Sequence, residues 1–259
     1  MSDALRFLTV DAPRTTPRGP AAVANEFSYV GTELDLFAHA EHWKSYWCSQ
    51  MMGFVRGDVL EVGAGIGVNT RLLCDGKAES WTCLEPDAKL AGRLLEGLKE
   101  SPFARRCHVI VGTVPALERS QRFDSIIYVD VLEHIEDDRD ELARVALHLK
   151  ANGAIVVLAP AHQWLYTRFD EAIGHYRRYT KETLAAAAPP GLNMDKLVYL
   201  DSVGLMASLA NRLFLRRGMP SMAQIRFWDR YFVLCSRWLD PLVGYSVGKS
   251  VLGVWRKTI

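Results

Sequence analysis

Residues 58–67, which read DVLEVGAGIG, combine a short apolar strand with a glycine-rich turn that opens a helix. Glycine lets the backbone turn sharply and approach a ligand that a Cβ atom would push away, and the N–H groups that open the helix face an anionic group. The spacing is G-x-G-x-G, whereas the dinucleotide fingerprint G-x-G-x-x-G would need glycine in place of Val68. The turn therefore predicts a cofactor site in an α/β fold and disfavours a nicotinamide dinucleotide. The alternative is a tight β–α connection without a ligand.

A second apolar strand, residues 81–84, ends in Glu85-Pro86-Asp87. An acidic side chain at the end of strand two, roughly twenty residues past the glycines, is placed to accept hydrogen bonds from ribose hydroxyls. This context favours a ligand site over a plain connection. Together the two elements predict a nucleoside with a second polar end, bound at the carboxyl ends of parallel strands.

At these two motifs and at residues 123–134, which read FDSIIYVDVLEH, the chain resembles the class I S-adenosylmethionine-dependent methyltransferases, in their small-molecule subgroup. The likeness covers about residues 40–200. It implies S-adenosyl-L-methionine as cofactor and S-adenosyl-L-homocysteine as product. It also implies a Rossmann-like, seven-stranded, mostly parallel sheet with helices on both faces, in which strand seven inserts antiparallel between strands five and six.

The resemblance assigns roles to the motif residues. Glu61 and the glycine turn would hold the methionyl end, Glu85 the ribose, and the segment from Asp130 to His134 the reaction side. Where many relatives carry an acidic residue for adenine, this chain has residues 111–114 (VGTV), so adenine is expected on backbone groups and Thr113. The expected cofactor-binding residues are Tyr46, Glu61, Gly63, Ala64, Gly65, Gly67, Glu85, Pro86, Thr113, Val114, Asp130 and Val131.

Size and composition limit the class of protein. The chain has 259 residues, 49% of them hydrophobic, enough for one substantial core. Its five cysteines are odd in number and widely spaced, which argues against a disulfide framework and a zinc site, and we expect no metal. We also expect neither a secretory leader nor a membrane span, and a cytoplasmic location.

Charge gives weaker guidance about partners. The net charge of +1 gives no general reason to expect nucleic-acid binding. Residues 202–259, however, contain nine Lys or Arg against two Asp. Two interpretations remain open, a solvated basic helix face and a peripheral contact with a membrane surface.

The pattern of elements predicts one domain with an insertion. Residues 1–24 contain prolines and little periodicity, so we expect a flexible N-terminal arm before a methyltransferase domain over 25–259. Residues 202–217 have helical spacing, and Ser221 and Gln224 form a capping-box pattern that opens a second helix. We expect a helical hairpin over 202–240, inserted between the last two strands, that shapes or covers a substrate pocket or forms a homodimer contact. The apolar stripe of its second helix is Ile225, Trp228, Phe232, Cys235 and Leu239.

The remaining elements alternate in the α/β manner. Asp87 caps a helix with a stripe at Leu90, Leu94, Leu95 and Leu98. A helix over 138–150 is expected to end at Asn152-Gly153, before a strand over 154–159. The other elements are expected over 69–74 for a helix and over 107–111, 124–129, 195–200 and 250–255 for strands.

Two histidines are candidates for catalysis. Methyl transfer is an in-line displacement that needs a positioned nucleophile and, if that nucleophile carries a proton, a base. His134 follows strand four, and the ordinary histidine pKa near 6.5 suits a base at neutral pH. It is our first choice, and the alternative is that it caps a helix or bonds to the backbone. A second group lies in the loop 170–180, where we select His175 and Tyr176. Arg177 and Arg178 there have a structural alternative, pairing with Asp170 and Glu171.

These observations predict methyl transfer to a small, aromatic or apolar biosynthetic acceptor, at an O, N or C atom. The expected acceptor-binding residues are Tyr29, Tyr179 and Trp228. One alternative is a lipid-linked acceptor at a membrane surface. Another is a binding module that retains S-adenosylmethionine without turnover.

Overall fold

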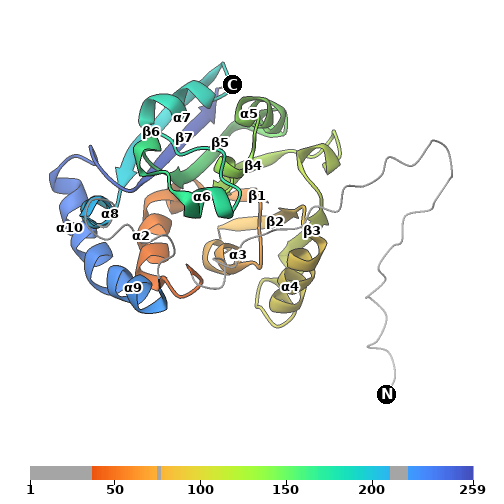
Figure 1. Ribbon diagram of the computed structural model, residues 1–259. Coiled ribbons are helices and arrows are strands. Elements are labelled where there is room, and N and C mark those ends of the chain that lie inside the picture. Colours follow the sequence, from red (N-terminus) through yellow and green to blue (C-terminus); the bar gives the residue numbers. More distant parts are fainter. Residues whose placement is uncertain (1–36, 75–76, 211–220, 259) are drawn as a thin grey trace.

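The structure, a computed structural model, describes residues 37–74, 77–210 and 221–258 (Figure 1). Its centre is a seven-stranded sheet in the order β3-β2-β1-β4-β5-β7-β6, in which β7 alone runs antiparallel to its neighbours β5 and β6. This is the predicted Rossmann-like sheet, with the last strand inserted as expected. The strands are β1 (Gly57–Val62), β2 (Ala78–Glu85), β3 (Cys107–Val111), β4 (Phe123–Val129), β5 (Leu149–Pro160), β6 (Leu192–Leu200) and β7 (Ser250–Lys257). The α-helices are α2 (Glu41–Met51), α3 (Val68–Leu73), α4 (Ala88–Leu98), α5 (Asp138–Ala146), α6 (Arg168–Ala172), α7 (Lys181–Ala187), α8 (Ser202–Ala210), α9 (Met222–Phe227) and α10 (Leu234–Leu242).

Strand register brings the predicted motifs to one edge of the sheet. Val62, the last residue of β1, pairs with Leu84 of β2 on one side and with Tyr128 of β4 on the other. The three strands therefore end together. The glycine turn, Glu85 and Asp130 follow these ends, which is where ligands bind in open parallel sheets.

Helices cover both faces of the sheet, and each face has its own apolar core. On one face, residues of α2, α3 and α4 pack with strand residues such as Trp81 and Ile127. On the other face, residues of α5 and α7 pack with strand residues such as Ile126 and Val157. Alternate residues of a strand point to opposite faces, so neighbours such as Ile126 and Ile127 belong to different cores. The two-faced burial confirms the predicted layers.

The boundary between α5 and β5 lies earlier than predicted. Helix α5 ends at Ala146, and Asn152-Gly153 lies inside β5, not at the end of the helix. Phe123 pairs with Leu149 but Ser125 pairs with Ala154, so β5 carries extra residues at a bulge, and Asn152 has a left-handed φ of 59°. An Asn-Gly pair suits a bulge and a helix terminus equally well, which explains the wrong boundary.

Between β6 and β7 lies the predicted helical insertion. Helix α8 is followed, after residues 211–220, by α9, a π-helical segment (Trp228–Val233) and α10 in one continuous run. The capping box at Ser221 and Gln224 is present. The predicted extension of the first helix to 217 falls on residues outside the described part. Among the described residues, no helix is both long and apolar enough to cross a bilayer.

The apolar stripe predicted for the second helix is buried only in its first half. Ile225 is buried and Trp228 and Phe232 are partly buried, but Cys235 and Leu239 are exposed. The fully buried positions of the run are Ile225, Asp229, Val233, Ser236 and Asp240. A π-helical turn holds more residues than an α-turn, so positions beyond it are rotated relative to a 3.6-residue repeat.

Candidate active site

The glycine turn is fixed by close packing as well as by backbone conformation. Gly63, Gly65 and Gly67 all have left-handed φ values, of 68°, 56° and 75°. A Cβ atom on Gly63 would lie 2.5 Å from a methyl group of Val131, and one on Gly67 would lie 2.2 Å from Leu94. Larger residues are therefore excluded at these two positions by both strain and contact.

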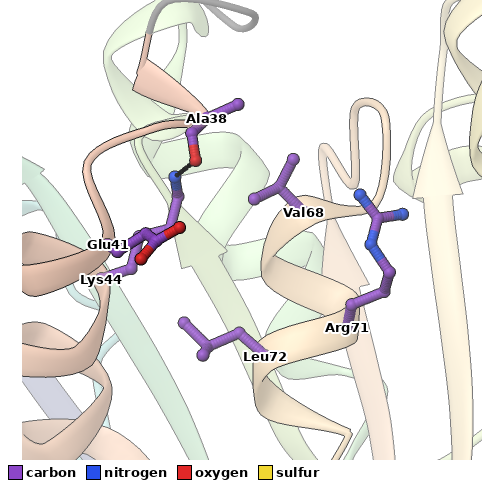
Figure 2. Close-up of a pocket in the computed structure, with 6 residues that line it drawn as sticks. All are labelled: Ala38, Glu41, Lys44, Val68, Arg71 and Leu72. Atoms are coloured by element: carbon purple, nitrogen blue, oxygen red, sulfur yellow. Dashed lines mark hydrogen bonds between the residues drawn. The ribbon is translucent and has the colours of Figure 1, made fainter.

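A pocket of about 270 Å³ lies beside this turn, between the start of α2 and α3 (Figure 2). Lys44 lies on its wall and donates hydrogen bonds to the carbonyl oxygens of Phe37 and Ala38 at 2.5 and 2.7 Å. Burial lowers the pKa of Lys44 to about 8. Apart from Val68, which directly follows Gly67, the lining residues carried no signal in the sequence. The lining residues are Ala38, Glu41, Lys44, Val68, Arg71 and Leu72.

Glu85 joins the second motif to the glycine turn. Its side chain is buried; one carboxylate oxygen accepts from the Gly65 N–H at 2.8 Å and the other from the Asp87 N–H at 2.9 Å. Burial raises the pKa of Glu85, although the two hydrogen bonds act to lower it. Each carboxylate oxygen has a second lone pair, so the group can also accept from ligand hydroxyls. The Gly112 N–H, next to Thr113, donates to the Glu85 carbonyl, which brings the loop after β3 to the same place.

Glu61, in β1 just before the glycine turn, is almost fully buried. One oxygen accepts from the Thr70 hydroxyl at 2.6 Å and from the Trp81 indole N–H at 2.8 Å. Burial raises the pKa of Glu61 to about 7. The structure therefore ties this carboxylate to α3 and β2.

The other predicted cofactor residues surround the strand ends. Asp130 directly follows β4, and its φ of 54° is left-handed, an uncommon conformation for a residue with a Cβ that is often found at functional sites. Its N–H donates to the Leu158 carbonyl, which fixes the strained residue beside β5. Thr113 is exposed and Pro86 half-buried, whereas Ala64 and Val114 are buried.

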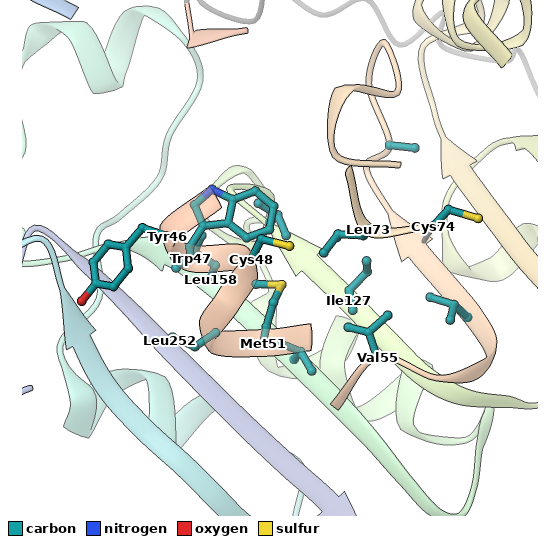
Figure 3. Close-up of a cluster of buried hydrophobic side chains, with 14 of the residues drawn as sticks. Tyr46, Trp47, Cys48, Met51, Val55, Leu73, Cys74, Ile127, Leu158 and Leu252 are labelled. Atoms are coloured by element: carbon teal, nitrogen blue, oxygen red, sulfur yellow. The ribbon is translucent and has the colours of Figure 1, made fainter. Parts of the chain in front are cut away.

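Two tyrosines predicted to bind ligands lie in the core. Tyr46 is buried on α2, and its hydroxyl donates to Asp240 at 2.6 Å, on the side of the helix away from Leu73 (Figure 3). Tyr179 is buried as well, and its hydroxyl donates to Asp138 at 2.7 Å. Burial, with the neighbouring carboxylate, raises the pKa of both phenols. A buried tyrosine hydroxyl needs such a partner, and the partners here are other parts of the chain.

Trp228 lies where the helical insertion meets α2. Its indole N–H donates to Asp201 at 2.8 Å, its ring lies 5.9 Å from that of Trp43, and the Lys249 ammonium lies 4.7 Å from the ring centre. Burial lowers the pKa of Lys249. No motif in the sequence pointed to Lys249. Tyr29, the third predicted acceptor residue, is outside the described residues.

The loop after β5 places His175 in a hydrogen-bonded pair with Asp170. The His175 Nδ1 lies 3.0 Å from a carboxylate oxygen of Asp170, and Nε2 lies 3.8 Å from a carboxylate oxygen of Glu133. Arg178 donates two hydrogen bonds to Asp170, at 2.7 and 3.1 Å. Burial alone would raise the pKa of Asp170, but the hydrogen bonds from His175 and Arg178 hold it well below its usual range.

The other loop residues differ in exposure and pairing. Arg178 forms an ion pair with Asp170, which is the structural role given as the alternative for this arginine. Arg177 pairs with Asp138, at 2.9 Å, and not with Glu171. Tyr176 has an exposed ring and donates its N–H to the Glu133 carbonyl.

His134 lies against His175, with the two rings nearly perpendicular and their centres 4.5 Å apart. Burial, together with the neighbouring His175 ring, lowers the pKa of His134 to about 4. His134 is therefore neutral at pH 7, and a weaker base than its ordinary pKa suggested.

Glu133, next to His134 in the chain, is fully buried, and burial raises its pKa well above the usual value. Neither of its carboxylate oxygens has a hydrogen-bond partner among the described residues. A carboxylate oxygen of Glu133 and one ring nitrogen of each histidine lie within 4.8 Å of one another, so the group could hold a cation.

Comparisons with known proteins agree with this geometry. The sequence model of one family, described as a methyltransferase domain, matches residues 39–189. Solved structures with the same fold include a sarcosine dimethylglycine methyltransferase, described as putative, from Galdieria sulphuraria, with 17% identity, a TM-score of 0.57 and coverage of 84% of this chain and 85% of that one. Another is the N-methyltransferase NodS from Bradyrhizobium japonicum WM9 with S-adenosyl-L-homocysteine, with 16% identity, a TM-score of 0.53 and coverage of 85% and 87%. A third is phosphoethanolamine N-methyltransferase 2 from Haemonchus contortus with S-adenosyl-L-methionine, with 14% identity, a TM-score of 0.58 and coverage of 88% and 58%. No curated protein matches the sequence.

Proposed function

Since the chain belongs to the methyltransferase-domain family of class I, S-adenosylmethionine-dependent enzymes, we propose that it transfers a methyl group from S-adenosyl-L-methionine to a small acceptor. The acceptor we propose is aromatic or apolar and is methylated at an O, N or C atom. In support, aromatic rings gather where the helical insertion meets α2, since Trp228 contacts the rings of both Phe37 and Trp43. Such rings favour flat or apolar ligands.

The observation that carries the proposal is the link between Glu85 and Gly65. The 2.8 Å hydrogen bond holds an acidic side chain directly over the glycine turn, at the edge where β1, β2 and β4 end. A nucleoside with a charged second end needs hydroxyl acceptors and a turn without side chains at one place. Both are present here.

We propose that His175 removes the acceptor proton when the nucleophile carries one. Asp170 is held as a carboxylate by Arg178, so it accepts the His175 Nδ1–H and leaves the lone pair on Nε2. Nε2 would take the acceptor proton, and bound S-adenosyl-L-methionine would supply the methyl group, with the electrons of the broken S–CH₃ bond staying on the sulfur of S-adenosyl-L-homocysteine. His134 has a lowered pKa, so it is the weaker base of the two and we assign it a positioning role. This reverses the preference for His134 drawn from the sequence.

Calorimetric titration with S-adenosyl-L-methionine tests the cofactor site. Glu85→Ala should weaken binding, whereas Glu79→Ala, at an exposed position on the same strand, should not. A methyl-release assay over a panel of phenols, amines and electron-rich rings then tests catalysis. Cofactor binding without turnover on any acceptor would favour the binding-module alternative.

A lipid-linked acceptor is the second candidate. The observation that favours it is the row of exposed aromatic and aliphatic side chains along α9 and α10. An acceptor panel should therefore include a lipid-linked hydroxyl presented in vesicles beside the soluble compounds.

A further inference from the structure

The helical run from α9 to α10 has an exposed apolar face. Its members recur at spacings of 4, 3, 4 and 4 residues, so they lie along one side of the helix. They are Phe227, Tyr231, Leu234, Trp238 and Leu242, exposed by 53%, 52%, 38%, 81% and 81%. Figure 1 shows α9 and α10 at the outer margin of the molecule, beyond α2 and α8. A row of large apolar side chains at this exposure is unusual for a soluble surface and marks an interaction site.

The opposite side of the same helix is already packed against the protein. Its buried positions include Ile225 and Val233, which belong to the apolar core. Asp229 accepts hydrogen bonds from the backbone N–H groups of His42 and Trp43 at 3.1 and 2.8 Å. Asp240 accepts from the N–H groups of Asp201 and Ser202 at 2.7 and 3.0 Å. Since this side makes the contacts with the rest of the fold, core packing does not account for the exposed apolar row.

The exposed charged side chains on this helix are all positive. Arg226, Arg230 and Arg237 are exposed, while Asp229 and Asp240, the only acids over 222–242, are buried and hydrogen-bonded. A surface that combines arginines with Trp, Tyr, Phe and Leu matches the charge and the polarity gradient of an anionic lipid headgroup layer.

We propose that this face docks the protein on an anionic phospholipid surface, with the helix lying in the plane of the headgroups. Trp238 and Leu242 enter the acyl boundary, while the three arginines contact lipid phosphates. A second copy of the chain fits this face less well. In a two-fold contact the same patch meets itself, which sets the arginines against one another with no exposed acid on this helix to pair with them. The inference does not depend on methyl transfer.

Vesicle sedimentation tests the proposal with the full chain. We expect binding to vesicles of mixed phosphatidylglycerol and phosphatidylcholine, loss of binding at high salt, and little binding to phosphatidylcholine alone. Trp238→Ser with Leu242→Ser should lower partitioning at least about tenfold, since two large apolar side chains no longer enter the lipid. Leu147→Ser, which removes a leucine that is 71% exposed after α5, is the matched control and should not change it.

A second pair of variants tests the charge. Replacing Arg226, Arg230 and Arg237 with Gln should weaken binding on the order of a hundredfold at low salt. The same change at Lys89, Arg105 and Arg139, which are exposed elsewhere, should have a much smaller effect. Calorimetry with S-adenosyl-L-methionine on each variant shows that it is folded and reports separately on the proposed enzyme function.

Three results would overturn the proposal. The first is absence of binding to anionic vesicles, and the second is equal binding by the wild type and the Trp238→Ser, Leu242→Ser variant. The third is a dimer in light scattering that these substitutions dissociate while the wild-type protein does not bind vesicles, which would make the face a contact between copies.

Discussion

Replacing Glu85 tests its proposed role in ligand binding together with its fixation of the glycine turn. Both carboxylate oxygens accept backbone N–H groups, from Gly65 and Asp87. Hydrogen bonds to a charged group contribute about 1.5–3 kcal/mol net, so Glu85→Ala should raise the dissociation constant of S-adenosyl-L-methionine by roughly 10- to 150-fold. Glu85→Gln keeps the shape but turns its NH₂ group toward one of the two N–H donors. We therefore expect the amide to be impaired almost as much as alanine.

Calorimetric titration at pH 7.5, well above the carboxyl range, measures both variants, and far-UV circular dichroism checks that they are folded. Glu79→Ala on the same strand serves as the control. Wild-type affinity in Glu85→Ala would place the ribose elsewhere. Wild-type affinity in Glu85→Gln alone would show that only one of the two N–H contacts matters, and the reasoning from paired acceptors would be wrong.

Three further predictions concern the turn and the histidines. Gly65→Val puts a branched side chain at a left-handed φ of 56° beside the ligand, so cofactor binding should vanish while the circular dichroism spectrum persists, and retained binding would reject the site. His175→Asn should lower kcat by about 10²- to 10⁴-fold with cofactor affinity little changed, His134→Asn should act mainly on KM, and equal kcat losses at both positions would contradict the assignment. The folded-state pKa of His134, about 4, lies below the ordinary value near 6.5, so the unfolded chain binds the proton more readily. Stability from this group is complete above pH 6.5 and falls toward pH 4, by at most about 3 kcal/mol; His134→Gln should flatten that part of a urea-unfolding profile, and an unchanged slope would refute the lowered pKa.

The sheet was predictable because its signals are local in sequence. Apolar strands, the glycine turn and the position of Glu85 each depend on a few adjacent residues, and the resemblance they carry supplied the strand order. Asn152-Gly153 was misread because the same dipeptide suits a bulge and a helix end. Nothing in the local sequence distinguishes the two.

The orientations of Tyr46 and Tyr179 could not be predicted for a different reason. Tyr46 was chosen as an aromatic residue near the crevice, but its direction is set by Asp240, which is 194 positions away in the chain. Tyr179 is likewise turned by Asp138. The Arg178–Asp170 pair was foreseen as an alternative, since the two residues share one loop. Partners distant in sequence are not readable from a pattern of single residues.

The contacts of the helical insertion also bear on whether it can move as a lid. Asp229 ties it to the start of α2 through His42 and Trp43, and Asp240 ties it to Tyr46 and to the end of β6 through Asp201. Each hydrogen bond to these carboxylates contributes about 1.5–3 kcal/mol net, so lifting the helix from α2 would cost on the order of 10 kcal/mol before the loss of its buried apolar contacts is counted. That is comparable to the whole binding free energy of a micromolar ligand, about 8 kcal/mol, so a small acceptor cannot drive the opening. We therefore infer that the run from α9 to α10 is a fixed platform, which presents its apolar and basic face whether or not the crevice is occupied.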